Sequence, residues 1–475
     1  MNKKFYITTP IYYVNDKPHV GSAYTTIAAD VLARFYRARG DEVFFLTGVA
    51  EHGSKIAASA EKAGKEPEEF VDEMAPKFKS AWKKLNISND DFIRTTEPRH
   101  EKAVEKFFIK LKESGKLYEK DYEGLYCVGH EAFVKQSDLV DGVCPEHKTK
   151  PEIVKEKNWF FKLSEYGEIL TKKIKSDELI IAPDERKNEV LSFISQGLED
   201  IAVSRQNAKF ALPLPWDKNQ TIYVWLDELF NYCSAICYGE DVREFHRFWP
   251  ADLHLVGKDI IKFHCVIWPA LLLAIGEEIP RKVFAHGFFT SGGAKMSKSL
   301  GNVLDPVELA EKYCVDAVRY FLLREVPFGQ DGDVSEEKLA ARYQSDLANG
   351  LGNLLQRTIS MINKYKIRIS KSETNEEKPE TNIKILNLIE ELKFDQALTE
   401  IWKVIAELNQ FIDQSKPWEL AKSDSGKLVE VLSEVHRSLS NLVTPISYFM
   451  PETADKMKHQ LETLKPEPLF PRIEK

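Results

Sequence analysis

Residues 5–53 of this 475-residue chain read FYITTPIYYVNDKPHVGSAYTTIAADVLARFYRARGDEVFFLTGVAEHG, and this stretch decides the fold class. Residues 5–9 and 43–49 are short apolar runs with the character of buried β-strands. Between them, apolar side chains recur at helical spacing at Ile27, Val31, Leu32 and Phe35. Gly40 follows where a helix is expected to end. We therefore expect a strand, a helix and a strand, which begin a parallel α/β sheet.

A second block of the same type begins at residue 253, with strand-like LHLVG, an apolar helical run at 260–275 and strand-like VFAHG. The two blocks lie about two hundred residues apart, which predicts a nucleotide-binding sheet split by a large insertion. The chain becomes helical from residue 345, with helices expected at 347–362, 383–391, 396–411 and 427–442. Residues 370–381 have the composition of a solvated loop.

The expected fold is an α/β protein with a split Rossmann-type parallel sheet, an inserted zinc-knuckle-like domain and a C-terminal α-helical bundle. Residues 1–117 and 222–325 are the expected halves of the Rossmann domain, and 118–221 the inserted connective domain. Residues 326–344 are an expected linking segment, and 345–475 the expected bundle.

Composition limits the classes of partner. The chain has 66 Lys and Arg against 74 Asp and Glu, a net charge of −8, which argues against coating nucleic acid by bulk electrostatics. Six cysteines without a leader-like start suit a reducing compartment. The longest uncharged apolar stretch, residues 265–275, is shorter than the roughly 18–20 residues that span a bilayer. We expect a cytoplasmic protein, with neither membrane nor DNA as a partner.

The first candidate site is at residues 12–22, YYVNDKPHVGS, between the first expected strand and helix. Phosphates bind at such junctions in open α/β sheets, because the helix N-terminus attracts anions. Gly21 permits a close approach of the backbone, and His19 can donate a hydrogen bond to a phosphate oxygen. A His before a Gly is also common in surface turns, so this motif is a weak signal alone.

The second candidate site is KMSKS at residues 295–299, preceded by Gly292-Gly293 and followed by Gly301-Asn302. Two lysines on a glycine-hinged loop can neutralise the charge that builds on a leaving pyrophosphate. The alternative is a solvated basic loop. We expect this loop and the His19 loop to meet over one nucleotide.

The His19-Val20-Gly21 motif and KMSKS together resemble the class I aminoacyl-tRNA synthetases. A finer resemblance, to the methionyl-tRNA synthetases, covers nearly the whole chain. Its motifs are YTTIAAD (24–30), FLTGVAEHG (45–53), IYVWLD (222–227), GKDI (257–260), Phe263-His264, Trp268-Pro269, His286-Gly287 and PLFPRI (468–473).

The resemblance implies a two-step reaction. The carboxylate of methionine attacks the α-phosphate of ATP to give methionyl-adenylate and pyrophosphate, and tRNA(Met) then accepts the methionyl group. Mg²⁺ is expected to accompany the nucleotide. The catalytic residues implied are His19, Lys295 and Lys298. The ATP-binding residues implied are His19, Gly21, Ser22, Gly257, Asp259, Ile260, Lys295 and Lys298.

The resemblance also implies a methionine pocket. An unbranched thioether calls for an apolar, aromatic pocket with a few polar groups. The matching positions are Ile11, Tyr13, Trp225, Glu228, Tyr232, Phe263, His264 and Trp268. Without the resemblance, most of these residues would be interpreted as core.

Two departures from the family pattern affect these sites. Ser22 stands where the family usually has a second histidine, and it can donate a hydrogen bond but carries no charge. Ala50 stands where the family has an Asp that meets the substrate's ammonium group, and Glu228 replaces a small residue that lines the same pocket. We hypothesise that Glu228 supplies the missing negative charge. The alternative is that Glu228 points to solvent and the pocket is impaired.

A candidate zinc site lies in the expected insertion. It contains two Cys/His pairs of the same spacing, Cys127-Val128-Gly129-His130 and Cys144-Pro145-Glu146-His147. Thirteen residues separate the two pairs. Two Cys and two His at this spacing suit a tetrahedral Zn²⁺. Zinc-bearing relatives usually have Cys at the second position, where this chain has His130. The alternative is a knuckle without metal that is held by packing.

The C-terminal helices carry the expected RNA contacts, and residues 326–344 are expected to contact the tRNA stem. Amide groups, a guanidinium and an exposed ring suit unpaired bases. The resemblance assigns anticodon reading to Asn349, Asn353, Arg357, Pro417 and Trp418. No further domain that would add dimerisation is recognised in the sequence, so we expect a monomer.

Two rival interpretations remain at this point. A class I synthetase of the branched-chain subgroup would need a larger editing insertion than about one hundred residues can form. A non-catalytic paralogue that binds tRNA or nucleotide is favoured by Ala50 and Ser22 but not by the intact KMSKS motif.

Overall fold

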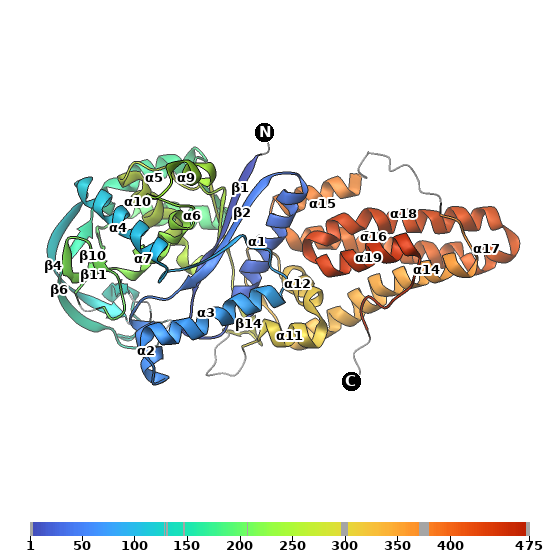
Figure 1. The fold of residues 1–475 in the computed structure, drawn as a ribbon, viewed down its shortest axis with the longest axis horizontal. Coiled ribbons are helices and arrows are strands. Elements are labelled where there is room, and N and C mark those ends of the chain that lie inside the picture. The colour runs from blue at the N-terminus through green and yellow to red at the C-terminus, as the bar shows by residue number, and fades with distance from the viewer. Residues whose placement is uncertain are drawn as a thin grey trace. The chain divides into compact units, whose positions relative to one another are not determined.

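A computed structural model of the chain describes residues 3–127, 129, 132–145, 148–206, 208–295, 303–369 and 380–471. The chain forms two compact units, whose residue ranges can be followed by colour in Figure 1. The first unit comprises residues 1–18, 36–80 and 88–286, and the second comprises 19–35, 81–87 and 287–475.

A parallel β-sheet organises the first unit (Figure 1). All of its paired strands are parallel. Over the described residues it has six strands, in the order β3 (Asp91–Arg94), β2 (Glu42–Ala50), β1 (Lys4–Tyr13), β12 (Leu253–Gly257), β13 (Lys282–His286) and β7 (Ile180–Ala182). Strands from both ends of the long intervening segment therefore share one sheet, which confirms the expected Rossmann-like α/β architecture.

The expected strand, helix and strand of residues 5–53 are β1, α1 (Val20–Ala38) and β2. Gly40, with φ of +87°, follows α1 in a conformation that favours glycine. Strands β1 and β2 pair in parallel from Lys4 and Glu42 to Tyr13 and Ala50. Because parallel strands end at the same edge, Tyr13 and Ala50 share the carboxyl edge of the sheet with Gly257, the last residue of β12.

The segment between the two halves of the sheet is mainly antiparallel. One sheet has the order β5 (Ala132–Val134), β4 (Leu117–Cys127), β6 (Glu152–Phe161) and β8 (Ile201–Ala202). Another has the order β10 (Pro213–Leu214), β11 (Asp217–Ile222) and β9 (Ser204–Arg205). The expected domain boundaries stay predictions. Within the expected insertion of residues 118–221, β7 belongs to the parallel sheet, since Ala182 pairs with Phe284 of β13.

The helices of the first unit follow and connect these strands. They include α2 (Ser54–Lys62), α4 (Pro98–Glu113), α5 (Gly167–Lys175), α6 (Asp184–Ser195), α7 (Val224–Leu229), α8 (Asn231–Ser234) and α9 (Val242–Phe248). Helix α3 (Pro67–Lys84) continues from this unit into the second. The single helix expected at 260–275 is divided into a 3₁₀ turn η3 (Lys258–Ile260), a π-helical turn η4 (Phe263–Ile267) and α10 (Trp268–Ala274).

The second unit is mostly helical, as expected for the C-terminal region. Its three short strands in the described chain are β14 (Phe289–Ser291), β15 (Ala294–Lys295) and β16 (Gly332–Asp333). Its helices include α11 (Pro306–Tyr313), α12 (Val315–Arg324), α13 (Glu336–Arg342), the π-helical η6 (Tyr343–Gly352), α14 (Asn353–Lys364), α15 (Glu380–Glu390), α16 (Phe394–Ser415), α17 (Pro417–Ser423), α18 (Ser425–Phe449) and α19 (Pro451–Thr463).

The polar loop expected at 370–381 lies largely outside the described residues, and Thr381 belongs to α15. None of the helices in the described ranges is long and apolar enough to cross a membrane.

A buried ion pair ties distant parts of the second unit together. The Arg319 guanidinium on α12 lies 2.6 Å from the Asp30 carboxylate on α1, and both side chains are fully buried. Arg319 also donates hydrogen bonds to the carbonyl oxygens of Phe449 and Leu85, at 2.8 and 3.2 Å. One side chain therefore joins α1, α12 and the end of α18.

Candidate functional site

An aromatic wall forms from residues that the sequence placed in one pocket. The rings of Trp225 on α7 and Phe263 on η4 stack, with centroids 4.3 Å apart and planes at 17°. Tyr13, at the carboxyl end of β1, meets Trp225 edge-on at 6.3 Å. Ile11 is partly buried against the same core as Trp225 and Phe263. The structure thus brings together side chains from β1, α7 and η4.

A buried pair of polar side chains adjoins this wall. His264 Nδ1 lies 3.0 Å from the carbonyl oxygen of Ile260, and the Tyr232 hydroxyl lies 2.7 Å from His264 Nε2. Because a carbonyl only accepts, Nδ1 carries the hydrogen and Nε2 accepts from Tyr232. Burial lowers the pKa of His264 to about 4, so the ring is neutral at pH 7.

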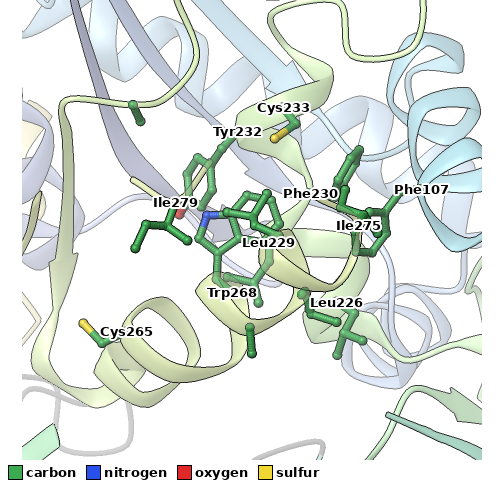
Figure 2. Close-up of a cluster of buried hydrophobic side chains, with 14 of the residues drawn as sticks. Phe107, Leu226, Leu229, Phe230, Tyr232, Cys233, Cys265, Trp268, Ile275 and Ile279 are labelled. Atoms are coloured by element: carbon green, nitrogen blue, oxygen red, sulfur yellow. The ribbon is translucent and has the colours of Figure 1, made fainter. Parts of the chain in front are cut away.

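Tyr232 and Trp268 lie within the apolar core of the first unit, where Figure 2 shows them close together. Their ring centroids are 6.1 Å apart. The Trp268 ring is fully buried, and its Nε1–H points to His254 Nε2 at 3.4 Å. His254 Nδ1 in turn lies 2.7 Å from the Thr8 hydroxyl on β1. Trp268 therefore helps to build the core beneath Tyr232.

Glu228 does not point to solvent. Its side chain, on α7, is 6% exposed, and its backbone carbonyl accepts a hydrogen bond from Asn231 Nδ2 at 2.7 Å. Burial raises the pKa of Tyr232, and the negative charge of Glu228 raises it further. Ala50, at the carboxyl end of β2, is fully buried. The proposed exchange of charge between positions 50 and 228 itself stays a prediction.

A buried network under α7 contains residues that the sequence did not assign to any role. Asp227 accepts hydrogen bonds from His52 Nδ1 at 2.7 Å and His100 Nε2 at 2.9 Å. Burial disfavours the charged forms of Asp227 and His52, but the attraction between the two side chains outweighs this penalty. The pKa of Asp227 is therefore lowered well below its usual range, and the pKa of His52 is raised. Asp227 and His52 lie in the quoted motifs, whereas His100 carries no spacing signal.

The His19 motif lies in the second unit, at the start of α1. His19 is exposed, and its Nδ1 accepts the backbone N–H of Gly21 at 3.0 Å, so Nε2 carries the hydrogen when the ring is neutral. A Cβ at Gly21 would lie 2.8 Å from His19 Cε1, so a larger residue there would require the His19 ring to shift. The Ser22 hydroxyl donates to the His19 carbonyl at 2.8 Å, so Ser22 stabilises this turn.

The segments that flank KMSKS are also in the second unit. Residues 296–302, which include Lys298, lie outside the described residues, and Lys295 is the last residue of β15. The hairpin of β14 and β15 turns at Gly292 and Gly293, both at positive φ, and Asp333 Oδ1 accepts the Gly293 N–H at 2.9 Å. After the loop, the Leu304 carbonyl accepts the N–H of Val20 at 3.1 Å.

The remaining expected ATP residues follow β12. Gly257 ends this strand, and Asp259 and Ile260 form the turn η3, in which Asp259 is exposed. These residues lie at the carboxyl edge of the sheet, where ligands of open α/β sheets bind.

The candidate zinc site is described only in part. Cys127, at the end of β4, and Cys144 are both buried. Cys144 lies in a turn whose hydrogen bonds join its N–H to Thr149 and its carbonyl to Lys148, each at 2.8 Å. His130 and His147 lie outside the described residues. Among the residues that are described, no three His, Cys, Asp or Glu side chains are grouped to hold a metal.

The expected anticodon residues belong to the helical unit, and most of them are on its surface. Asn349 on η6 and Asn353 on α14 are exposed. Arg357 donates to Asp413 near the end of α16, at 2.8 Å. Pro417, which begins α17, is buried, whereas Trp418 is 41% exposed. An exposed aromatic ring is the kind of group on which an unpaired base can stack.

A family model and curated relatives of this chain indicate the same family. The family model described as tRNA synthetases class I (M) matches residues 5–150 and 135–359. The methionine–tRNA ligase of Caldanaerobacter subterraneus is 48% identical over 473 residues, which cover 97% of this chain and 74% of that relative. The methionine–tRNA ligase of Rickettsia conorii is 43% identical over 491 residues, which cover 100% of this chain and 96% of that relative.

Solved structures agree with this result. The Mycobacterium tuberculosis methionyl-tRNA synthetase in complex with methionyl-adenylate has a TM-score of 0.91 at 38% identity, over 99% of this chain and 100% of that chain. The free form of the same enzyme has a TM-score of 0.83 at 35% identity, over 100% and 99%. The chain therefore belongs to the methionyl-tRNA synthetases, a family of class I aminoacyl-tRNA synthetases.

Proposed function

We propose that this chain, as a methionine–tRNA ligase, activates methionine with ATP and then transfers the methionyl group to tRNA(Met). The observation that carries this function is the similarity to methionine–tRNA ligases over nearly the whole chain, with 48% identity to that of Caldanaerobacter subterraneus. It is supported by the fold similarity to a methionyl-tRNA synthetase in complex with methionyl-adenylate.

The methionine side chain is proposed to lie against the aromatic wall of Tyr13, Trp225 and Phe263. Tyr232 and His264 form a neutral pair beside it, because the pKa of His264 is about 4. A neutral aromatic pocket suits an uncharged thioether and disfavours charged side chains, whose burial is costly. Ile11 and Trp268 complete the pocket by packing.

The ammonium group of methionine is proposed to pair with Glu228 in place of the carboxylate that Ala50 lacks. Glu228 is buried on the same short helix as Trp225, and a buried carboxylate is a strong partner for a buried ammonium. A charge-assisted bond of this kind contributes about 1.5–3 kcal/mol, which corresponds to roughly a ten- to hundredfold change in KM.

This exchange is tested with two variants. Glu228→Ala should raise the KM for methionine, and Ala50→Asp in that background should lower it again. A methionine KM that is unchanged in Glu228→Ala contradicts the exchange.

ATP is proposed to be held through two sets of residues. His19 Nε2–H would donate to a phosphate oxygen, with Gly21 and Ser22 shaping its turn. Lys295 and Lys298 would neutralise the departing pyrophosphate. The adenosine would be held by Gly257, Asp259 and Ile260, and Mg²⁺ would accompany the phosphates.

A Zn²⁺ ion is proposed at Cys127, His130, Cys144 and His147. The two cysteines are buried, and a thiolate and imidazole set suits zinc. Elemental analysis of the purified chain should find about one zinc ion per chain, and a chelator should lower its melting temperature. A zinc-free chain of unchanged thermal stability would instead indicate a knuckle held by packing.

The anticodon is proposed to bind at Asn349, Asn353, Arg357, Pro417 and Trp418. The exposed amides can bond base edges, and Trp418 can stack on a base. Aminoacylation of tRNA(Met) transcripts tests both this site and the function. Transcripts with the CAU anticodon should accept methionine, and transcripts with an altered anticodon should lose most of that activity. Equal charging of both contradicts the anticodon site, and charging of neither contradicts the function.

A further inference from the structure

Three proposed pocket residues are on two short helices of the first unit. Trp225 and Glu228 are on α7, and Tyr232 is on α8. These helices have six and four residues, and Tyr223 and Phe230, the residues before them, are not N-capping types. Helices this short are unstable alone, so their position depends on tertiary contacts.

Buried hydrogen bonds supply such contacts. His100, on α4, is fully buried, and its Nε2 lies 2.9 Å from the Asp227 carboxylate on α7. Its Nδ1 lies 2.8 Å from the Ser234 hydroxyl on α8. When Nε2 carries the hydrogen, it donates to Asp227, and the Ser234 hydroxyl donates to Nδ1. A single imidazole thus bridges both helices.

The other oxygen of Asp227 connects this bridge to the sheet. It accepts from His52, two residues after the end of β2, at 2.7 Å. Asp227 is 1% and His52 is 4% exposed, so water does not compete for these bonds. The network therefore joins α4, α7 and α8 to the carboxyl end of β2.

We infer that His100 is a positioning residue for methionine: by bridging Asp227 and Ser234 it sets the spacing of Trp225, Glu228 and Tyr232. His100 acts through these two partners and not by touching the substrate. The inference rests on the proposed function, because it assumes that those three side chains surround methionine. A displaced pocket wall weakens methionine binding without a direct effect on ATP.

The test measures methionine-dependent exchange of pyrophosphate into ATP. In His100→Ala, the KM for methionine should rise about tenfold or more while the KM for ATP stays within about twofold. Ser234→Ala removes one of the two bonds and should raise the methionine KM by a smaller factor. His100→Gln keeps a donor for Asp227 and should recover part of the loss.

Glu156→Gln is the matched control. Glu156, like Asp227, is a buried carboxylate that accepts a charged hydrogen bond, here from Arg205 at 2.8 Å, but it lies on β6. This variant should lower the melting temperature and leave the methionine KM unchanged. If His100→Ala lowers the melting temperature but not methionine affinity, His100 is only structural and the inference is overturned.

Two other outcomes are also informative. If His100→Ala does not fold, an unchanged methionine KM in Ser234→Ala still overturns the inference, and a raised one supports it. A wild-type chain with no methionine-dependent exchange contradicts the proposed function instead.

Discussion

The backbone N–H of Val20 donates a 3.1 Å hydrogen bond to the carbonyl of Leu304. Val20 follows His19 at the start of α1, and Leu304 lies six residues after Lys298. Before the KMSKS segment, the ring centroid of Phe289 on β14 lies 4.3 Å from the ring centroid of Tyr24 on α1. Within the second unit, both segments that flank KMSKS are thus connected to the helix that begins at the His19 motif.

We expect the turn before KMSKS to control the rate of methionine activation. Asp333→Ala removes the acceptor for the N–H of Gly293 and for the Thr290 hydroxyl, so the turn loses its side-chain anchor while the backbone pairing of β14 with β16 remains. The kcat of pyrophosphate exchange should fall by roughly tenfold or more, with the methionine KM nearly unchanged. Lys338→Ala removes a half-buried lysine that pairs with Asp333 and Glu325 but leaves the acceptor for Gly293 in place, so it should have little effect. Equal effects of the two variants would contradict this anchoring role.

Gly21 should be needed for the orientation of His19. In Gly21→Ala, the added methyl group would lie 2.8 Å from His19 Cε1 and would displace the ring. We expect kcat/KM for ATP to fall by about tenfold or more, since His19 is the proposed phosphate donor. Gly426→Ala is a suitable control, because a methyl group there meets only Asp424 Oδ1, at 3.5 Å. ATP kinetics that are normal in Gly21→Ala would argue against the role of His19.

Breaking the buried pair of Asp30 and Arg319 should strongly destabilise the second unit. Asp30→Asn leaves the buried charge of Arg319 without its carboxylate, and Arg319→Met removes several hydrogen bonds. Each variant should lower the free energy of unfolding by about 3–5 kcal/mol. The exposed pair of Lys84 and Glu311 is the control, and its loss should cost less than about 1 kcal/mol. Urea unfolding monitored by circular dichroism distinguishes the two cases. Similar losses for both pairs would mean that burial does not matter here.

The pair of Asp227 and His52 predicts a pH optimum of stability. The pKa of Asp227 is lowered, so its contribution is present above its ordinary pKa of 3.8 and is lost as the pH falls through the lower folded-state value. The pKa of His52 is raised, so its contribution is complete below 6.5 and is lost as the pH rises through the folded-state value. The pair should stabilise most between these two pH values.

Melting temperatures of the wild type and of His52→Gln, measured from pH 3 to 9, test this prediction. The variant should lose the decline of stability above pH 6.5 that His52 causes. Parallel curves for both proteins would show that His52 does not titrate with folding.

The fold was predictable where the chain has long, regular patterns. The apolar runs of β1 and β2, the helical spacing in α1 and the apolar block from β12 to β13 all formed elements close to the predicted ranges. Strand β7 has three residues, too few for periodicity to distinguish a strand from a loop. The division of residues 258–274 into η3, η4 and α10 was equally hidden, since apolar spacing does not separate π from α turns.

The candidate site was predictable in its residue types but not in its supporting contacts. Tyr13, Trp225 and Phe263 were placed in one pocket by the family resemblance, and the structure brings their rings together. The hydrogen bonds of His100 to Asp227 and Ser234 join residues more than one hundred positions apart. No local pattern marks such pairs, because they depend on how α4 packs against α8.

We claim that this chain selects methionine and activates it with ATP. The most direct measurement is the exchange of labelled pyrophosphate into ATP by the wild-type chain, with methionine, leucine, isoleucine or cysteine as the amino acid. We predict rapid exchange with methionine and, because a hydrophobic pocket discriminates by about 1–3 kcal/mol per methylene, at least tenfold lower kcat/KM for the others. Exchange that is absent with all four, or highest with an amino acid other than methionine, would contradict the claim.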